Sequence, residues 1–301
     1  MDNKKIACIG SGIIGAGLAV NAILNDYQVV IQDIADEKKV RQRICDVLSI
    51  MQEIGLCTAE RKEKALADLL VTASVEEAVK DAFFIQEACP DNMELKKQVY
   101  EKIEACCSQN AIIASTSTTL MPSDLQDNLN YPERFLIGHP FHPSYLIPLI
   151  EICPGKATTT ETIEAATRFY ESIKKYPVVC HKEVQGAIVN RLAWNINAAA
   201  KQTIADGICS AEELDRAFMY GPGLRMAITG LLLTMDLGVT GGYRNMAEKY
   251  GGENTPNDEL IAEQIDEEIE MRHQFEGQTR EEISKYRDYM IAEILKLQKM
   301  L

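Results

Sequence analysis

A glycine-rich turn joins an apolar strand-like segment to an apolar helix-like segment near the start of the chain. The turn reads Gly10-Ser11-Gly12-Ile13-Ile14-Gly15, follows the strand-like Lys5–Ile9 and opens the helical segment Gly12–Asn25. In this pattern the first glycine permits a tight turn, the second lets the backbone approach a pyrophosphate, and the third lets the helix pack close to the strand. The pyrophosphate then lies at the positive end of the helix. The turn therefore predicts a dinucleotide-binding site formed by Gly10 through Gly15.

An acidic residue at the end of the next strand indicates which dinucleotide binds. The expected strand Gln28–Asp33 ends in a carboxylate roughly 20 residues beyond the glycines, the usual spacing for the residue that binds the ribose. A carboxylate there accepts hydrogen bonds from the adenosine ribose and repels a 2′-phosphate, so Asp33 favours NAD over NADP. FAD proteins share the glycine pattern, but we find no further FAD-binding segment. We expect NAD as the cofactor.

Strand-like and helix-like segments alternate over the first part of the chain, which is typical of a doubly wound parallel sheet. The expected strands are Lys5–Ile9, Gln28–Asp33, Leu69–Thr72, Ala82–Glu87, Ala111–Ser115, Arg134–Gly138, Leu146–Ile152 and Pro177–His181. The expected helices between them are Gly12–Asn25, Asp36–Ile54, Glu60–Asp68, Val75–Lys80, Met93–Ser108, Ser123–Asn128 and Thr160–Lys175. We expect a Rossmann-type NAD-binding α/β domain over residues 1–184.

Only helical periodicity follows, and we expect no strand there. The expected helices are Gly186–Asp206, Ser210–Met219, Leu224–Met235, Arg244–Tyr250, Asp258–Glu276 and Thr279–Leu301. We therefore expect an all-helical C-terminal domain over residues 185–301.

Composition excludes several other classes of protein. The formal net charge of −14 argues against binding to a nucleic-acid backbone, which needs clustered Lys and Arg. No apolar run approaches the roughly 18 residues of a membrane span, and the N-terminus lacks the apolar core of a signal peptide. The nine cysteines are scattered without a Cys-x-x-Cys pair, which indicates packing in a reducing compartment. We expect a cytoplasmic protein with neither a metal site nor a membrane partner.

A short segment from Gly138 to Glu151 holds two of the four histidines, His139 and His142, and ends in a carboxylate. An imidazole held by a carboxylate is a recurring general base near neutral pH. Glu151 follows His139 by twelve residues, enough for a turn to bring the two side chains together. Alcohol oxidation sends a hydride to the nicotinamide and a proton to a base. The segment and the dinucleotide site together therefore predict an alcohol-oxidising enzyme.

Several segments, in this order, resemble the 3-hydroxyacyl-CoA dehydrogenase superfamily nearly end to end. They are the glycine turn, Gln86–Lys96, Ser115–Thr118, the His139 segment and Gly186–Leu192. The resemblance implies an NAD-dependent dehydrogenase with its dimer interface in the C-terminal domain.

The resemblance also implies catalytic roles. His139 is the expected base for the substrate hydroxyl, and Glu151 is expected to orient its ring and stabilise the imidazolium. Asn190 resembles an active-site hydrogen-bond donor near the substrate oxygen, although it could instead satisfy backbone groups at a helix start. Thr118 stands where the family has a Ser that contacts substrate and cofactor, although it could be only a polar strand end.

Three further residues are implied to lie near the cofactor. Asp91 and Lys96 stand where the family has an acid and a Lys beside the nicotinamide ribose. His142 replaces the Asn of the family's Phe-Asn-Pro; it keeps a donor or acceptor but is bulkier and titratable.

The downstream segments Gly221–Arg225 and Leu231–Gly238 resemble the branch of the superfamily that acts on free acids, such as carnitine-like or gulonate-like substrates. Arg225 is then a candidate clamp for a substrate carboxylate, or else a structural salt bridge at a helix start. A quaternary ammonium would need aromatic faces, and Met226 stands where that branch commonly has Trp. An L-3-hydroxyacyl-CoA substrate remains the alternative. A non-catalytic NAD-binding or crystallin-like structural protein is a third reading.

Overall fold

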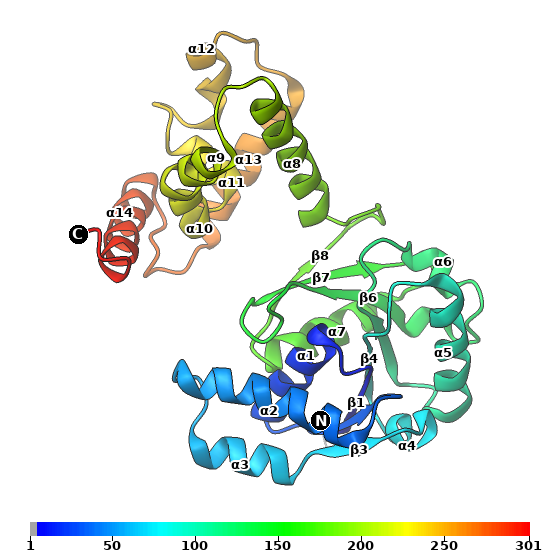
Figure 1. The fold of residues 1–301 in the computed structure, drawn as a ribbon. Helices are drawn as coiled ribbons and strands as arrows, with labels where there is room; N and C mark the ends of the chain where they lie inside the picture. The colour runs from blue at the N-terminus through cyan, green and yellow to red at the C-terminus, as the bar shows by residue number, and fades with distance from the viewer. Residues whose placement is uncertain (1–4) are drawn as a thin grey trace. The chain divides into compact units, whose positions relative to one another are not determined.

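The computed structural model describes residues 5–301 and contains one eight-stranded sheet (Figure 1). Its strands are β1 (Lys5–Ile9), β2 (Gln28–Gln32), β3 (Leu70–Thr72), β4 (Phe84–Glu87), β5 (Ile112–Ser115), β6 (Phe135–Pro140), β7 (Leu149–Pro154) and β8 (Tyr176–Val179). They lie in the order β3-β2-β1-β4-β5-β6-β7-β8. This is the doubly wound Rossmann-type sheet expected from the sequence.

The sheet departs from the expected parallel arrangement at one place, because β7 runs antiparallel to β6. Every other neighbouring pair is parallel. Only residues 141–148 join β6 to β7. A parallel return needs a crossover of roughly a dozen residues or more, so this connection suits only an antiparallel pair.

Helices cover both faces of the sheet (Figure 1). They are α1 (Ile13–Leu24), α2 (Glu37–Glu53), α3 (Ala59–Ala67), α4 (Val75–Val79), α5 (Met93–Cys106), α6 (Pro122–Gln126) and α7 (Thr160–Ser172), with a 3₁₀ turn at η1 (Pro132–Arg134). One core lies under α1, α2, α3 and α7, and a second lies under α4, α5 and α6. With both faces covered, β1 buries four consecutive residues, as central parallel strands do.

Helix α2 illustrates how the sequence specifies these elements. Val40, Ile44 and Leu48 recur at helical spacing and are all fully buried, so they form the stripe that packs on the sheet. The side chain of Asp36 accepts a hydrogen bond from the backbone of Lys38 and caps the start of the helix.

The described chain divides into two compact units, the first ending at Asn195 and the second spanning Ile196–Leu301. The division falls inside α8 (Val189–Ala205), so the domain boundary at 184/185 stays a prediction. Residues 185–301 form only helices, as expected. After α8 these are α9 (Ala211–Phe218), η2 (Met219–Gly223), α10 (Leu224–Thr229), α11 (Leu231–Asp236), η3 (Tyr243–Asn245), α12 (Met246–Tyr250), α13 (Pro256–Met271) and α14 (Arg280–Leu297).

The single helix expected over Leu224–Met235 is instead two helices. Gly230 separates α10 from α11 with φ of +75°, a left-handed conformation that only glycine adopts readily.

Two global properties concern the described residues as a whole. No helix in residues 5–301 is long and apolar enough to cross a membrane. All nine cysteines lie in this range and are free thiols.

A buried carboxylate organises the second unit beside its small apolar core of Leu233, Ile265, Ile269 and Ile283. Asp236 is fully buried and accepts hydrogen bonds from Nε and Nη2 of Arg280 at 2.8 and 3.0 Å. It also accepts one from the backbone N–H of Tyr243 at 2.7 Å. The hydrogen bonds of Arg280 to Asp236 and, second, to Asp266 raise the pKa of Arg280 above its ordinary value. Asp236 thus ties the end of α11 to both η3 and α14.

We predict that Asp236→Asn destabilises the protein by roughly 1.5–3 kcal/mol, because hydrogen bonds to a charged group are lost at a buried site. Urea unfolding followed by circular dichroism measures this loss. Arg287→Gln is the control, since its partner Asp288 has a side chain that is 68% exposed and such pairs contribute below about 1 kcal/mol. Equal effects of the two variants would contradict the role assigned to Asp236.

Candidate active site

The glycine turn has the geometry of a dinucleotide site. Gly10 has φ of +96°, and a Cβ there would lie 2.8 Å from the carbonyl oxygen of Ala88. A Cβ on Gly15 would lie 2.1 Å from the carbonyl oxygen of Gly10, so the third glycine lets α1 pack against the turn. A Cβ on Gly12 would meet nothing within 4 Å, which leaves open space at the start of α1. The residues present therefore fit a pyrophosphate at the helix N-terminus.

Asp33 lies directly after β2 and faces this turn. Its Oδ2 accepts a hydrogen bond from the backbone N–H of Ser11 at 2.8 Å and another from the Ser11 hydroxyl. Its Oδ1 accepts the N–H of Ala35 at 2.8 Å. Burial alone would raise the pKa of this carboxyl, but the bonds from Ser11 and Ala35, with the charge of Arg43, hold it below the ordinary value. An ionised carboxylate at this position fits NAD.

His139 and Glu151 form the hydrogen-bonded pair expected from the sequence. They are paired across β6 and β7 in the antiparallel register, so their side chains lie on the same face of the sheet. His139 Nδ1 lies 3.0 Å from Glu151 Oε2, and both residues are buried. With Nδ1–H donating to the carboxylate, Nε2 of the neutral ring is an acceptor, and it lies 3.2 Å from the hydroxyl of Thr118. The structure thus brings three of the predicted catalytic residues together.

The second oxygen of Glu151 has a role that the sequence analysis missed. Oε1 accepts the backbone N–H groups of Ile188 at 2.9 Å and Val189 at 2.8 Å, where α8 begins. Burial alone would raise the pKa of Glu151, but the bonds from His139, Val189 and Ile188 together hold it below its ordinary value. Glu151 therefore binds the imidazole with one oxygen and the start of α8 with the other. Asn190 is the next residue of that helix.

The turn before α8 has an unusual backbone conformation and lies in close contact with a tryptophan ring. Gly186 and Ala187 both have positive φ, +78° and +47°. A Cβ on Gly186 would lie 2.4 Å from the ring of Trp194, so the tryptophan packs directly on the glycine backbone. Glycine at this position is what allows that contact.

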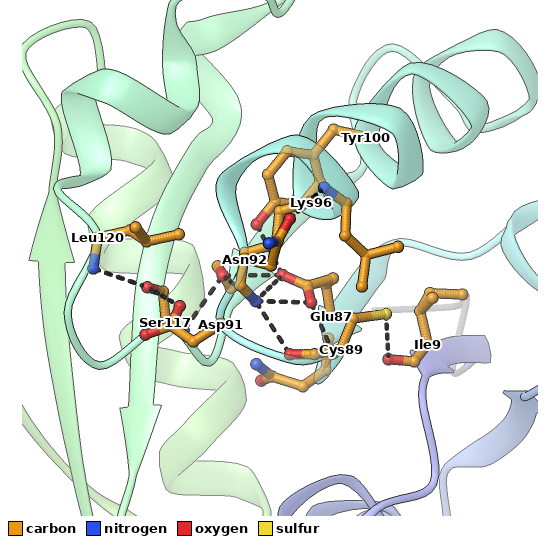
Figure 2. A network of polar contacts seen from close by, with 12 residues as sticks. Ile9, Glu87, Cys89, Asp91, Asn92, Lys96, Tyr100, Ser117 and Leu120 are labelled. Atoms are coloured by element: carbon orange, nitrogen blue, oxygen red, sulfur yellow. Dashed lines mark hydrogen bonds and ion pairs between the residues drawn. The ribbon is translucent and has the colours of Figure 1, made fainter.

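Asp91 lies just before α5 and binds the segment that carries Thr118 (Figure 2). Its Oδ1 accepts the hydroxyl of Ser117 at 2.6 Å. Its Oδ2 accepts the backbone N–H of Thr118 at 3.2 Å and both the N–H and the hydroxyl of Thr119, at 3.0 and 2.8 Å. Burial alone would raise the pKa of this carboxyl, but the bonds from Ser117 and Thr119 hold it below the ordinary value.

Lys96 lies elsewhere than expected. Its ammonium is fully buried and binds both oxygens of Glu87, at 2.8 and 2.9 Å (Figure 2). Glu87 also accepts the hydroxyls of Tyr100 at 2.6 Å and Ser115 at 2.8 Å. A cofactor contact of Lys96 stays a prediction that this geometry does not support. The sequence signal for the pair was partial: an acid ends the buried strand β4 and a Lys stands one helical turn into α5, but nothing in the sequence pairs the two.

The remaining predicted residues are placed as follows. His142 is exposed in the loop after β6. Ser144 in the same loop donates to the carbonyl of Ile14 at 2.9 Å, so the loop after His139 packs on the first turn of α1. Arg225 lies in α10 of the second unit and is exposed; it forms no salt bridge with any of residues 5–301. Its role as a carboxylate clamp stays a prediction.

We predict that Glu151→Gln flattens the acid dependence of stability. The pKa of Glu151 is lowered in the folded state, so its contribution is present above the ordinary value of 4.5 and is lost as pH falls through and below it. At pH 7 the variant should lose roughly 1–3 kcal/mol, because the backbone N–H groups and the imidazole lose a charged acceptor.

Urea unfolding at pH 7 and pH 4 tests this. Glu164→Gln is the control, since Glu164 pairs with Arg168 on an exposed helix surface. A Glu151→Gln variant that keeps the wild-type difference between the two pH values would refute the prediction.

Comparison with known proteins agrees with the geometry over the whole chain. The family model for the 3-hydroxyacyl-CoA dehydrogenase NAD binding domain matches residues 5–184, and the model for the C-terminal domain of the same family matches residues 186–282. An L-carnitine dehydrogenase of Oceanobacillus iheyensis is 40% identical over 274 residues, covering 89% of this chain and 88% of the relative. One of Bacillus cereus is 36% identical over 304 residues, covering 98% and 92%.

Solved structures show the same fold. A 3-hydroxyacyl-CoA dehydrogenase of Archaeoglobus fulgidus has a TM-score of 0.73 at 23% identity, covering 99% of this chain and 100% of the other. An NAD⁺-dependent 5-formyl-3-hydroxy-2-methylpyridine 4-carboxylic acid 5-dehydrogenase has a TM-score of 0.74 at 24% identity, covering 98% and 99%. The fold, the glycine turn and the matches along the chain together show that the protein belongs to the 3-hydroxyacyl-CoA dehydrogenase family, whose members are NAD-dependent oxidoreductases acting on CH–OH groups.

Proposed function

We propose that the protein uses NAD to oxidise the 3-hydroxyl of a short free L-3-hydroxy acid, with L-carnitine the first substrate to test. The observation that carries this proposal is the buried His139–Glu151 pair, in which Nε2, the ring nitrogen not held by Glu151, lies 3.2 Å from the hydroxyl of Thr118. The loop that follows His139 packs on the helix that begins at the glycine turn. A base and a dinucleotide site on connected elements support alcohol oxidation.

The chemistry divides between cofactor and protein. NAD, held by the glycine turn and Asp33, would supply the acceptor for the hydride of the carbinol carbon. His139 Nε2 takes the proton of the substrate hydroxyl, and the ionised Glu151 stabilises the imidazolium that results. The hydroxyl of Thr118, at 3.2 Å from Nε2, lies where it can hold the substrate oxygen against the ring. Asn190, one residue beyond the anchored start of α8, is proposed as a second donor to that oxygen.

The proposed cofactor residues are the glycine turn, Asp33 and His142. The open space at Gly12 supports a pyrophosphate there, and the low pKa of Asp33 supports a charged acceptor for ribose hydroxyls. His142 lies in the same loop as Ser144, the residue that contacts the first turn of α1, and this supports a place near the nicotinamide.

The relatives support a free acid rather than a CoA thioester. The L-carnitine dehydrogenases are 40% and 36% identical over most of the chain. The free carboxylate would bind Arg225 in this proposal, because a guanidinium binds carboxylate through two parallel bonds. Met226 provides no aromatic face for a quaternary ammonium, so gulonate-like acids belong in the same test. A purely structural protein would have no need of the buried pair.

We predict NAD reduction with a free acid from a panel of L-carnitine, L-gulonate, L-3-hydroxybutyrate and L-3-hydroxybutyryl-CoA, measured by NADH absorbance. His139→Gln should lower kcat by roughly 10²–10⁴-fold, because the base is lost, while NADH binding is retained. The exposed His181→Gln is the matched control. Activity on the thioester alone would overturn the substrate class. Near-full turnover of His139→Gln would overturn the base, and NADH binding without activity on any compound would favour a structural protein.

The proposal includes a homodimer formed through the C-terminal domain and a cytoplasmic location. No residue of α8 is buried, and its exposed side chains include Ile196 and Ile204. A helix with apolar residues and no buried face is typical of an interface between subunits. The nine free cysteines support a reducing compartment.

We predict a solution mass twice that of the 33.6 kDa chain in light scattering coupled to gel filtration. Ile204→Glu should shift the protein toward the monomer, because a charge would be buried at the interface without a partner. Tyr176→Glu, at an exposed position of the first unit, should leave the mass unchanged. A wild-type monomer at micromolar concentration would refute this part of the proposal.

A further inference from the structure

We propose that Asp91 is a positioning residue that holds Thr118 against His139, and that it acts in catalysis through this contact rather than by binding the cofactor. The inference rests on the proposed function, since it concerns the base of the same reaction. It departs from the expectation that Asp91 lies on the nicotinamide ribose.

The contacts of Asp91 are directed at one segment. Both of its carboxylate oxygens accept hydrogen bonds from residues 117–119, four bonds in all, two from backbone N–H groups and two from hydroxyls. This segment follows β5, which ends at Ser115, and precedes α6, which begins at Pro122. It therefore lacks a strand or helix of its own, and the carboxylate supplies the acceptor that regular structure would otherwise give.

The segment that carries Asp91 is itself held in place by Glu87 (Figure 2). The fully buried Glu87 accepts the N–H of Cys89 at 2.7 Å and binds the ammonium of Lys96, so the chain on both sides of Asp91 is tied to one carboxylate. The same Glu87 accepts the hydroxyl of Ser115, which in turn accepts the N–H of Ser117 at 3.2 Å. The ends of both segments thus share one buried anchor.

Asp91 acts on the base, His139, through Thr118. Its backbone N–H donates to Asp91, and its hydroxyl lies 3.2 Å from His139 Nε2. A threonine side chain has a restricted χ1, so fixing the backbone of Thr118 fixes where its hydroxyl points. Loss of the carboxylate would release the backbone and let the hydroxyl leave the ring. An amide at position 91 keeps one acceptor but turns an NH₂ group toward donors, so Asp91→Asn should break the arrangement with little change in volume.

Asp91→Asn tests the proposal through three measurements: NADH affinity by fluorescence, kcat and KM for the oxidised acid, and the imidazole ¹⁵N signals of His139. We expect kcat to fall roughly 10- to 100-fold, because a small misplacement at the reacting centre has that effect. The NADH Kd should stay within about threefold, which corresponds to about 0.65 kcal/mol. The His139 signals, assigned with His139→Gln among four histidines, should move as they do in Thr118→Val.

Two comparisons sharpen the result. Glu94→Gln removes the same charge from the first turn of α5, where Glu94 accepts a hydrogen bond from Gln98 and from no other side chain of residues 5–301. It should change none of the three measurements. In a Thr118→Val background, Asp91→Asn should have little further effect on kcat, because residues that act through one contact are not additive.

A cofactor-binding role for Asp91 would give a different result in these measurements. A rise of more than about tenfold in the NADH Kd, with unchanged His139 signals, would make Asp91 a cofactor ligand and overturn the proposal. If Asp91→Asn does not fold, Ser117→Ala and Thr119→Val each remove bonds while the carboxylate stays, and an unchanged kcat and spectrum in both would overturn it. If the wild type oxidises no hydroxy acid, the proposed function fails, yet the ¹⁵N signals and NADH affinity still decide where Asp91 acts.

Discussion

The buried carboxylate of Glu151 connects the imidazole of His139 to the start of α8, the helix that follows the sheet. One oxygen binds the imidazole of His139 and the other binds two backbone N–H groups at the start of α8. This arrangement depends on the antiparallel pairing of β6 and β7, because only that register places the two side chains opposite each other. A parallel β7 would have sent Glu151 to the other end of the sheet. The local reversal of strand direction is therefore what makes the site.

Carboxylates that accept backbone N–H groups recur at the edge of the sheet where the parallel strands have their C-terminal ends. Asp33, Asp91 and Glu151 each accept backbone N–H groups from an irregular segment: the glycine turn, residues 117–119 and the entry to α8. In each case side-chain and backbone hydrogen bonds together outweigh burial and keep the pKa of the carboxyl below its ordinary value. Irregular segments are where ligands approach a Rossmann sheet, and they lack ladder partners of their own. Ionised side chains in or just beyond the neighbouring strands provide those partners, so the edge is ordered before a ligand arrives.

Much of this could be predicted from the sequence, for identifiable reasons. The unit from β1 to β2 was predicted because glycine spacing and apolar runs are local signals. The His139–Glu151 pair was predicted because a twelve-residue spacing and a family pattern pointed to the same two residues. The direction of β7 was missed because apolar periodicity alone carries no information about strand orientation, although the short connection between the expected strands Arg134–Gly138 and Leu146–Ile152 already indicated it. The partner of Lys96 was missed because a buried ion pair depends on which elements meet in space, and the break at Gly230 because an isolated glycine inside a helical pattern is ambiguous. The roles of Asn190 and Arg225 stay predictions.

The contact between Trp194 and Gly186 gives the protein a built-in optical probe. Trp194 is the single tryptophan of the chain, and its ring packs on the glycine of the turn that leads into the helix anchored by Glu151. Indole emission responds to the polarity and packing around the ring. All tryptophan fluorescence of this molecule therefore arises at one place, beside the joint between the sheet and α8. A change in that emission, in an unlabelled and unmodified protein, reports on the surroundings of this one ring.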